Sequence, residues 1–396
     1  MELAKRLDRI SEPQTIKMAK LSRELKAQGH NIIDLSLGEP DFRTPDHINE
    51  AAIRAMEAGF TKYTPVVGYP ELREAICRKL KRDNDLEYGI DEIIVSTGAK
   101  QCLANAVLSL VDPGDEVVIP TPYWVTYSAL VQLAEGKCKF IDCFIDTDFK
   151  LTPGKLEAGL SDKTKMFIFS SPCNPTGSVY SKEELAGLAE VFSRYPNVFI
   201  ISDEIYEYIN FAGKHESIAQ FPGMKDRTAV VNGMSKGFAM TGWRLGYMAA
   251  PKQLIQACDK MQAQFTSATS SITQRAAIAA LTEDLAPTFA MVEAFKQRRE
   301  FVISALSKMP GVKINKPEGA FYAFPNISSF IGKTDGETTI NNDEDFSMYL
   351  LHKAHVTTVN GGAFGNGSCV RISYATSIEQ LKEGMERIRI ALEKLH

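Results

Sequence analysis

Seven short apolar runs recur between residues 93 and 249, and they leave few folds open to this chain. They begin near Ile93, Glu116, Cys138, Met166, Val198, Thr228 and Leu245. Each run ends in a polar or glycine-bearing turn and is followed by a segment with helical periodicity. Residues 166–169 and 198–201 are apolar at successive positions, which is typical of strands covered on both faces, and intervening helices favour parallel pairing. We therefore predict an α/β fold with a largely parallel, seven-stranded, doubly wound sheet.

The two ends of the chain show a different pattern. The expected elements are a helix at 13–28, a short strand at 32–37, a long charged helix after 287, strands near 320–324 and 370–374, and a last helix that opens at Ser377 with Gln380. We predict that both termini build a smaller α+β domain, residues 1–45 and 286–396, beside a large domain of residues 46–285. Residues 328–345 are rich in Thr, Asn, Gly and Asp, which predicts an exposed loop.

The composition excludes several classes of partner. The chain has 396 residues, enough for two or three domains. Its 45 basic and 49 acidic residues give a net charge of -4, which leaves no positive surplus for nucleic acid or an anionic membrane surface. No apolar run approaches the ~20 residues that cross a bilayer, and residues 1–8 lack the apolar core of a secretory signal, so we expect a cytoplasmic protein. The seven cysteines are scattered without C-x-x-C spacing, which predicts reduced thiols and no metal site.

The residues that follow each apolar run are the candidates for chemistry, because ligands of open α/β sheets bind outside the carboxyl ends of the strands. The first run ends in Ser96-Thr-Gly-Ala-Lys-Gln101, a turn of small residues before a helical pattern that starts at Cys102. A helix N-terminus offers free N–H groups and the positive end of the helix dipole, which together bind anions. The turn therefore indicates an anion site, with a plain strand-to-helix turn as the alternative.

Two further runs end in polar residues that could face a ligand. Asn174 stands between Pro172 and Pro175, which restrict the backbone and hold the amide in place. Asp203 and Tyr206 follow the fifth run and bring a carboxylate and a phenol to the same edge. A carboxylate there can pair with a protonated ring nitrogen, although a helix-capping aspartate and a core tyrosine are the simpler interpretation.

The strongest candidate nucleophile is Lys236, which follows the sixth run. A desolvated lysine has a lowered pKa and can form a Schiff base with pyridoxal 5'-phosphate (PLP), whereas an ordinary loop lysine is solvated. Arg244 follows in the next turn, and its planar guanidinium suits a phosphate. Arg371 lies on the polar face of run 370–374, where it is either solvated or a clamp for a substrate carboxylate. Trp124 follows the second run, and its indole could stack on a ring or fill the core.

Four motifs together point to one family. They are Asn174-Pro-Thr-Gly177, Ser202-Asp-Glu-Ile-Tyr206, Ser235-Lys236-Gly237 and Thr241-Gly-Trp-Arg-Leu-Gly246. With these motifs the chain resembles the class I aminotransferases, which are PLP enzymes of fold type I, from about Pro13 to its C-terminus. It is most similar to their bacterial aspartate aminotransferase subgroup. The resemblance implies that the large domain binds PLP.

The resemblance also implies the residues that contact the cofactor. Lys236 would form the Schiff base, and Asp203 would pair with the pyridine nitrogen. Tyr206 and Asn174 would hold the ring 3-oxygen. The remaining contacts would come from Ala99, Lys100, Ser235 and Arg244 around the phosphate, from Trp124 on the ring, and from Tyr63, lent to the phosphate by a neighbouring subunit. The match at Tyr63 therefore implies a homodimer with shared active sites.

The substrate contacts implied by the resemblance are Gly38, Lys100, Trp124, Asn174 and Arg371. Arg371, with Gly38 and Asn174, would bind the α-carboxylate, and Lys100 would bind a second carboxylate. Lys236 would act as general base and acid in a ping-pong cycle. The implied reaction is transamination between L-aspartate and 2-oxoglutarate, giving oxaloacetate and L-glutamate.

Departures from the subgroup's pattern concern the choice of substrate. Thr15 is displaced by one position, Asn360 stands where relatives often have proline, and Gly233 lacks a hydroxyl at the phosphate. Aromatic, alanine or kynurenine-type amino acids, or a lyase reaction, are therefore alternatives on the same fold. A nicotinamide oxidoreductase would need G-x-G-x-x-G after the first strand, where this chain has Ser-Thr-Gly-Ala-Lys.

Overall fold

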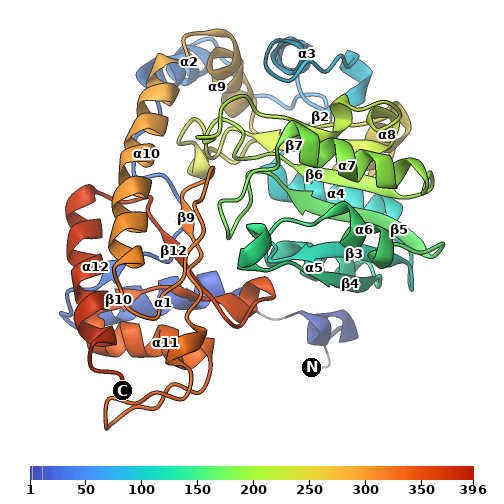
Figure 1. The fold of residues 1–396 in the computed structure, drawn as a ribbon. Helices are drawn as coiled ribbons and strands as arrows, with labels where there is room; N and C mark the ends of the chain where they lie inside the picture. Colours follow the sequence, from blue (N-terminus) through green and yellow to red (C-terminus); the bar gives the residue numbers. More distant parts are fainter. Residues whose placement is uncertain (2, 11) are drawn as a thin grey trace.

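A seven-stranded sheet runs through the larger part of the molecule (Figure 1). The structure is a computed structural model, and it describes residues 1, 3–10 and 12–396. The strands are β2 (Ile93–Ser96), β3 (Glu116–Thr121), β4 (Lys137–Asp142), β5 (Thr164–Ser170), β6 (Phe199–Asp203), β7 (Thr228–Gly233) and β8 (Gly246–Ala249). Their order is β2-β8-β7-β6-β5-β3-β4, and β8 is antiparallel to both neighbours while the other pairs are parallel. Each predicted run is a strand that begins within two residues of its expected start, so the predicted sheet is confirmed.

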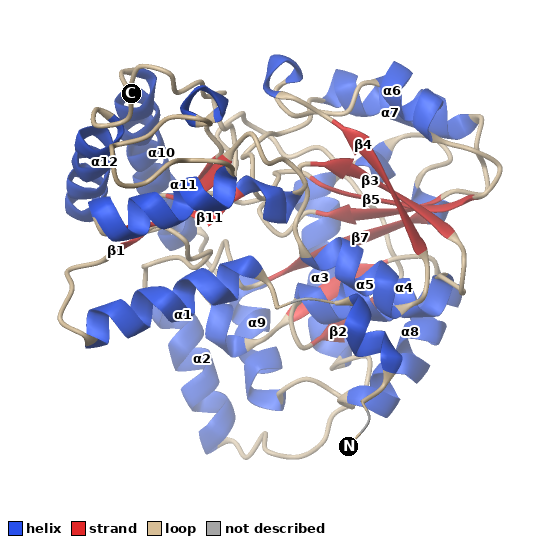
Figure 2. Ribbon diagram, turned by 90° about the horizontal axis from the view of Figure 1, so that it is seen from below, coloured by secondary structure: helices blue, strands red, loops and turns tan. Residues whose placement is uncertain are grey.

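Helices cover both faces of the sheet, and further helices pack on the strands formed by the two ends of the chain. They are α1 (Gln14–Ala27), α2 (Asp46–Glu57), α3 (Pro70–Asn84), α4 (Ala99–Leu110), α5 (Thr126–Leu133), α6 (Pro153–Gly159), α7 (Lys182–Ser193), α8 (Lys252–Phe265), α9 (Ser271–Thr282), α10 (Ala286–Ser307), α11 (Asp343–Tyr349) and α12 (Ile378–Leu392). Successive strand residues point to opposite faces, so Ile94 packs under α4 and α8 while Val95 packs with α2, α3 and α9. Figure 2 shows α6 and α7 on one side of the strands and α4, α5 and α8 on the other. Within the described ranges, no helix is both long and apolar enough to cross a bilayer.

Segments from both ends of the chain pack together beside this sheet (Figure 1). The strands there are β1 (Ile33–Asp34), β9 (Tyr322–Ala323), β10 (Val356–Thr357), β11 (Val359–Asn360) and β12 (Val370–Ser373). β12 lies between β11 and β9 in an antiparallel sheet, and β1 pairs in parallel with β10. One core joins β9 and β12 to α10 and α12, which supports our proposal that the smaller domain begins again near residue 286.

Two predictions about the chain ends differ from the structure. The strand expected at 32–37 is only Ile33–Asp34, because β10 offers it just two partner residues. The exposed loop expected at 328–345 is wrong for Phe330 and Ile340, which are buried in the core shared by α10 and α12, whereas Ile331 is exposed. Thr, Asn, Gly and Asp dominate this segment, so its few buried apolar residues form no periodic pattern in the sequence.

A buried ion pair, which the sequence pattern does not reveal, ties α3 to the turn after β6. The side chain of Lys79 is fully buried, forms an ion pair with the carboxylate of Glu207 and donates to Asn84 Oδ1 at 2.7 Å. Glu207 also accepts from Asn232 Nδ2 at 2.7 Å. A buried ammonium is tolerated only when its charge and its hydrogen bonds are matched, and these side chains provide both.

We expect Lys79→Met to lower the free energy of unfolding by about 3 to 5 kcal/mol, because it leaves the Glu207 carboxylate buried without its partner. Lys81→Met on the same helix is the matched control, since the Lys81–Glu87 pair is exposed and should contribute little. Urea unfolding curves of the two variants would measure the difference. Equal midpoints would contradict the structural role given to Lys79.

Candidate active site

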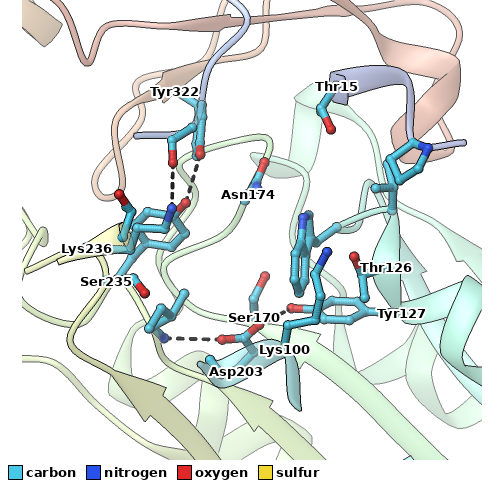
Figure 3. A pocket seen from close by; sticks show the side chains of 18 of the residues that line it. Thr15, Lys100, Thr126, Tyr127, Ser170, Asn174, Asp203, Ser235, Lys236 and Tyr322 are labelled. Carbon is cyan, nitrogen blue, oxygen red and sulfur yellow. Dashed lines mark hydrogen bonds between the residues drawn. The ribbon is translucent and has the colours of Figure 1, made fainter. Parts of the chain in front are cut away.

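A cavity of about 270 Å³ opens where the carboxyl ends of β5, β6 and β7 face the sheet that contains β12. Its size is near the lower end of the range typical of small-molecule sites. Of the twelve predicted site residues, eleven line this cavity: Gly38, Ala99, Lys100, Trp124, Asn174, Asp203, Tyr206, Ser235, Lys236, Arg244 and Arg371. Figure 3 shows Lys236 and Ser235 on one side and Lys100 and Tyr127 on the other, with Asp203 between them.

Lys236 is partly buried in the turn three residues after β7. Its Nζ donates to the carbonyl oxygen of Gly38 at 2.5 Å. Desolvation, together with the positive charges of Arg371 and Arg244, lowers the pKa of Lys236 to about 8. A substantial fraction of the amine is therefore neutral near physiological pH, which is what a nucleophilic lysine requires.

Asp203 is the last residue of β6, and its carboxylate is buried. Oδ2 accepts from Tyr127 Oη at 2.7 Å, and Oδ1 accepts from the Ile205 N–H at 3.3 Å. Burial raises the pKa of Asp203 to about 6, while the Tyr127 hydrogen bond acts in the opposite direction. Above pH 6 the group is mainly a buried anion, and it can pair with a cation in the cavity.

The N-terminus of α4 forms the positively polarised end of the cavity. The helix begins at Ala99 and not at Cys102 as predicted, because Gly98 adopts φ +86° and turns the chain sharply into the first helical turn. Gly246 on β8 permits this approach, since a Cβ there would lie 2.2 Å from Ala99 N. Arg244 adds a guanidinium to this end of the cavity. Its backbone has φ +56°, a strained conformation for a residue other than glycine, and such strain is common at functional sites.

Arg371 on β12 is a buried cation without a carboxylate partner. Its two terminal nitrogens donate to Asn174 Oδ1 at 3.0 Å and to the Ser36 carbonyl at 2.6 Å, while Nε is buried and unpartnered. Among the described residues, no carboxylate lies within 4.0 Å of this guanidinium. Burial accordingly lowers the pKa of Arg371. A buried charge of this kind needs a counter-ion, and the cavity is where a ligand carboxylate can supply it.

Trp124 and Lys100 form the opposite wall. The Lys100 ammonium lies 5.0 Å from the centre of the Trp124 ring, a cation–π distance. Trp124 is partly buried: it packs against the core beside α4 and α5, and it also lines the cavity.

Tyr63 is the one predicted site residue that the structure does not bring to the cavity. Its side chain is 97% exposed. Tyr63 is not among the residues that line the cavity of its own chain.

The lining also contains residues that were not predicted as site residues, among them Thr15, Thr126, Tyr127, Ser170 and Tyr322. Tyr127 lies three residues after Trp124, a helical spacing that could have indicated it. Tyr322 comes from β9, and its position follows from the pairing of Tyr322 with Ser373 on β12, which no local pattern encodes.

Comparisons with known proteins agree with this geometry. The family model described as aminotransferase class I and II matches residues 30–388. The chain is 48% identical to the aspartate/prephenate aminotransferase of Cereibacter sphaeroides, over 98% of both chains. It is 47% identical to the bifunctional aspartate aminotransferase and glutamate/aspartate-prephenate aminotransferase of Petunia hybrida, over 99% of this chain and 83% of that protein.

A solved structure gives the same result. The crystal structure of the aspartate aminotransferase from Rhizobium meliloti matches all of both chains with a TM-score of 0.97 at 44% identity. The sheet, the cavity and the family match are therefore consistent with one another. This chain belongs to the class I and II aminotransferases, enzymes that move amino groups with the help of PLP.

Proposed function

We propose that the enzyme transfers the amino group of L-aspartate to 2-oxoglutarate, giving oxaloacetate and L-glutamate. One observation carries the proposal: a single cavity holds an amine of lowered pKa, Lys236, and a buried guanidinium, Arg371, with no carboxylate within 4.0 Å in the part of the chain that the structure describes. The first binds an aldehyde and the second binds a carboxylate. The names of the relatives favour aspartate as the amino donor.

The polar groups of the cavity fit PLP. We propose that Asp203 pairs with the pyridine nitrogen, because its buried carboxylate accepts one hydrogen bond on each oxygen, from Tyr127 and from Ile205, and keeps further lone pairs for a protonated nitrogen. Tyr206 and Asn174 suit the ring 3-oxygen as donors. The phosphate would be held by the N-terminus of α4 with Lys100, Ser235 and Arg244, and Trp124 would stack on the ring. When bound, PLP supplies an electron sink that stabilises negative charge at the substrate's Cα.

The chain's own residues orient the substrate and move its proton. Arg371 binds the α-carboxylate, with the backbone of Gly38 and the amide of Asn174 beside it. In this orientation the neutral amine of Lys236 removes the proton from Cα as a general base, since Gly38 O holds Nζ next to the carboxylate site. Lys100, across the cavity from Lys236, binds the second carboxylate that aspartate and 2-oxoglutarate share (Figure 3).

Prephenate is a second candidate substrate, because the relatives from Cereibacter sphaeroides and Petunia hybrida include it in their names. It is also a keto acid with a second carboxylate, so the same cation, Lys100, would serve it. Amino acids without a second carboxylate would leave the Lys100 ammonium unused.

We also propose a homodimer in which Tyr63 of one subunit completes the phosphate site of the other. The support is its almost complete exposure, which is unusual for a tyrosine unless a partner covers it. Sedimentation at the mass of a single chain would contradict this proposal.

The half-reactions test the proposed function directly. The purified enzyme should absorb visible light, aspartate alone should remove that band with release of oxaloacetate, and 2-oxoglutarate should restore it. Lys236→Ala is the control and should show neither the band nor turnover. A clear preference for phenylalanine over aspartate in steady-state kcat/KM would exclude the proposed donor.

The lowered pKa of Lys236 predicts a pH dependence. Below pH 8 the amine is increasingly protonated and cannot attack an aldehyde, so the rate at which the apoprotein attaches PLP should fall about tenfold per pH unit. Above pH 8 the rate should level off. Stopped-flow absorbance across pH 6 to 11 would measure it, and a rate that still rises through pH 10 would indicate an ordinary solvated lysine.

Two variants separate the two carboxylate sites. Arg371→Leu should raise the KM of aspartate and alanine alike, because both carry an α-carboxylate. The expected loss of binding free energy is about 2 to 5 kcal/mol. Lys100→Ala should raise the KM of aspartate and leave that of alanine nearly unchanged. Steady-state kinetics with both amino acids would measure this. Equal losses in Lys100→Ala would assign Lys100 to the phosphate alone.

A further inference from the structure

Tyr322 touches three predicted site residues although it belongs to none of the motifs. Its hydroxyl lies 2.8 Å from the hydroxyl of Tyr206, and either atom can be the donor. Its ring lies 4.5 Å from Arg371 Cζ. Gly38 packs against its hydroxyl so closely that a Cβ at position 38 would lie 2.4 Å from Tyr322 Oη. The phenol therefore sits between the proposed 3-oxygen donor and the two proposed carboxylate ligands.

The contact between Tyr322 and Tyr206 crosses the junction of the two parts of the molecule. Tyr206 follows β6 of the large sheet, and Tyr322 lies on β9, beside the strand that carries Arg371. Both rings are buried, 3% and 1% exposed. Figure 3 shows Tyr322 on the same side of the cavity as Lys236. The Tyr322–Tyr206 hydrogen bond thus connects the proposed carboxylate site at Arg371 to Tyr206.

The proposed function determines which phenol donates. The ring 3-oxygen beside the lysine–cofactor link is anionic and can only accept, so the single proton of Tyr206 points to it. The Tyr206 oxygen must then accept the proton of Tyr322. Each hydrogen bond in such a chain polarises the next, so Tyr322 makes Tyr206 a stronger donor.

We propose that Tyr322 is a positioning residue with two tasks. Its hydroxyl donates to Tyr206, so that the cofactor's 3-oxygen binds the proton that it shares with Lys236 less tightly. Its ring holds Arg371 at the substrate carboxylate. This inference rests on the proposed function, because it needs Tyr206 at the 3-oxygen and Arg371 at the carboxylate. It gives the hydroxyl and the ring of Tyr322 separate tasks, which separate substitutions can test.

The hydroxyl is tested by titrating the visible band of the holoenzyme with pH. Tyr206→Phe removes a donor to an anion, so the 3-oxygen holds the shared proton more tightly and the midpoint should rise by about one to two pH units. Tyr322→Phe should raise the midpoint by a few tenths of a unit, because it removes only the polarising bond. In the Tyr206→Phe background, Tyr322→Phe should cause no further shift.

Tyr374→Phe is the matched control. Its hydroxyl is equally buried in the same core and donates to the Ala320 carbonyl at 3.3 Å, outside the cavity lining. It should leave the midpoint at the wild-type value. A wild-type midpoint in Tyr322→Phe, or an equal shift in the Tyr206→Phe background, would overturn the proposal. An unchanged midpoint in Tyr206→Phe would overturn the contact of Tyr206 with the cofactor itself, and the inference with it.

The ring is tested by a split between kinetic constants. Tyr322→Phe keeps the aromatic face over Arg371, so the KM of aspartate should stay within about twofold, whereas Tyr322→Leu should raise it about fivefold through loss of the cation–π contact. An equal KM in both variants would contradict the task assigned to the ring.

Discussion

Desolvation of charge at the carboxyl edge of the sheet is the constraint on which the site depends. Lys236, Arg371 and Asp203 are all placed where water is scarce, and each would be costly there without a partner. Lys236 responds with a lowered pKa, Asp203 with a raised one, and Arg371 keeps its charge and is held by neutral oxygens. The cavity is therefore prepared for an aldehyde, a ring cation and a carboxylate before any of them arrives.

The rest of the fold maintains these positions. Parallel strands bring Asp203 and the segment before Lys236 to one edge, and glycines at 98 and 246 let the N-terminus of α4 approach that edge. The Lys79–Glu207 pair holds the turn after β6, and neither residue lines the cavity. The chain's ends contribute Arg371 and Tyr322 to the cavity lining, on β12 and β9. Rigid elements on both sides hold the side chains in the geometry that chemistry requires.

Most of the sheet could be predicted from the sequence, since runs such as 166–169 are apolar on both faces and are bounded by turns. Elements at the chain ends were harder to predict: β1 has only two residues, and Phe330 and Ile340 lie in a segment dominated by polar residues and glycine. The candidate site was predictable where its residues lie at the end of a strand, as Asp203 does, or soon after it, as Asn174 does. Tyr322 was not, because its role depends on a partner 116 positions away.

The sequence by itself determined the strands, the order of polar residues at their ends and the family motifs, because these are local patterns of hydrophobicity and residue type. Tertiary structure alone decided which charges are desolvated and which oxygens hold them. The alternating strand pattern left Arg371 either solvated or a carboxylate clamp, and the fold buries it between Asn174 and Ser36. The physical reason is that burial and hydrogen-bond partners are set by segments distant in the chain, and the pKa of each group follows from them.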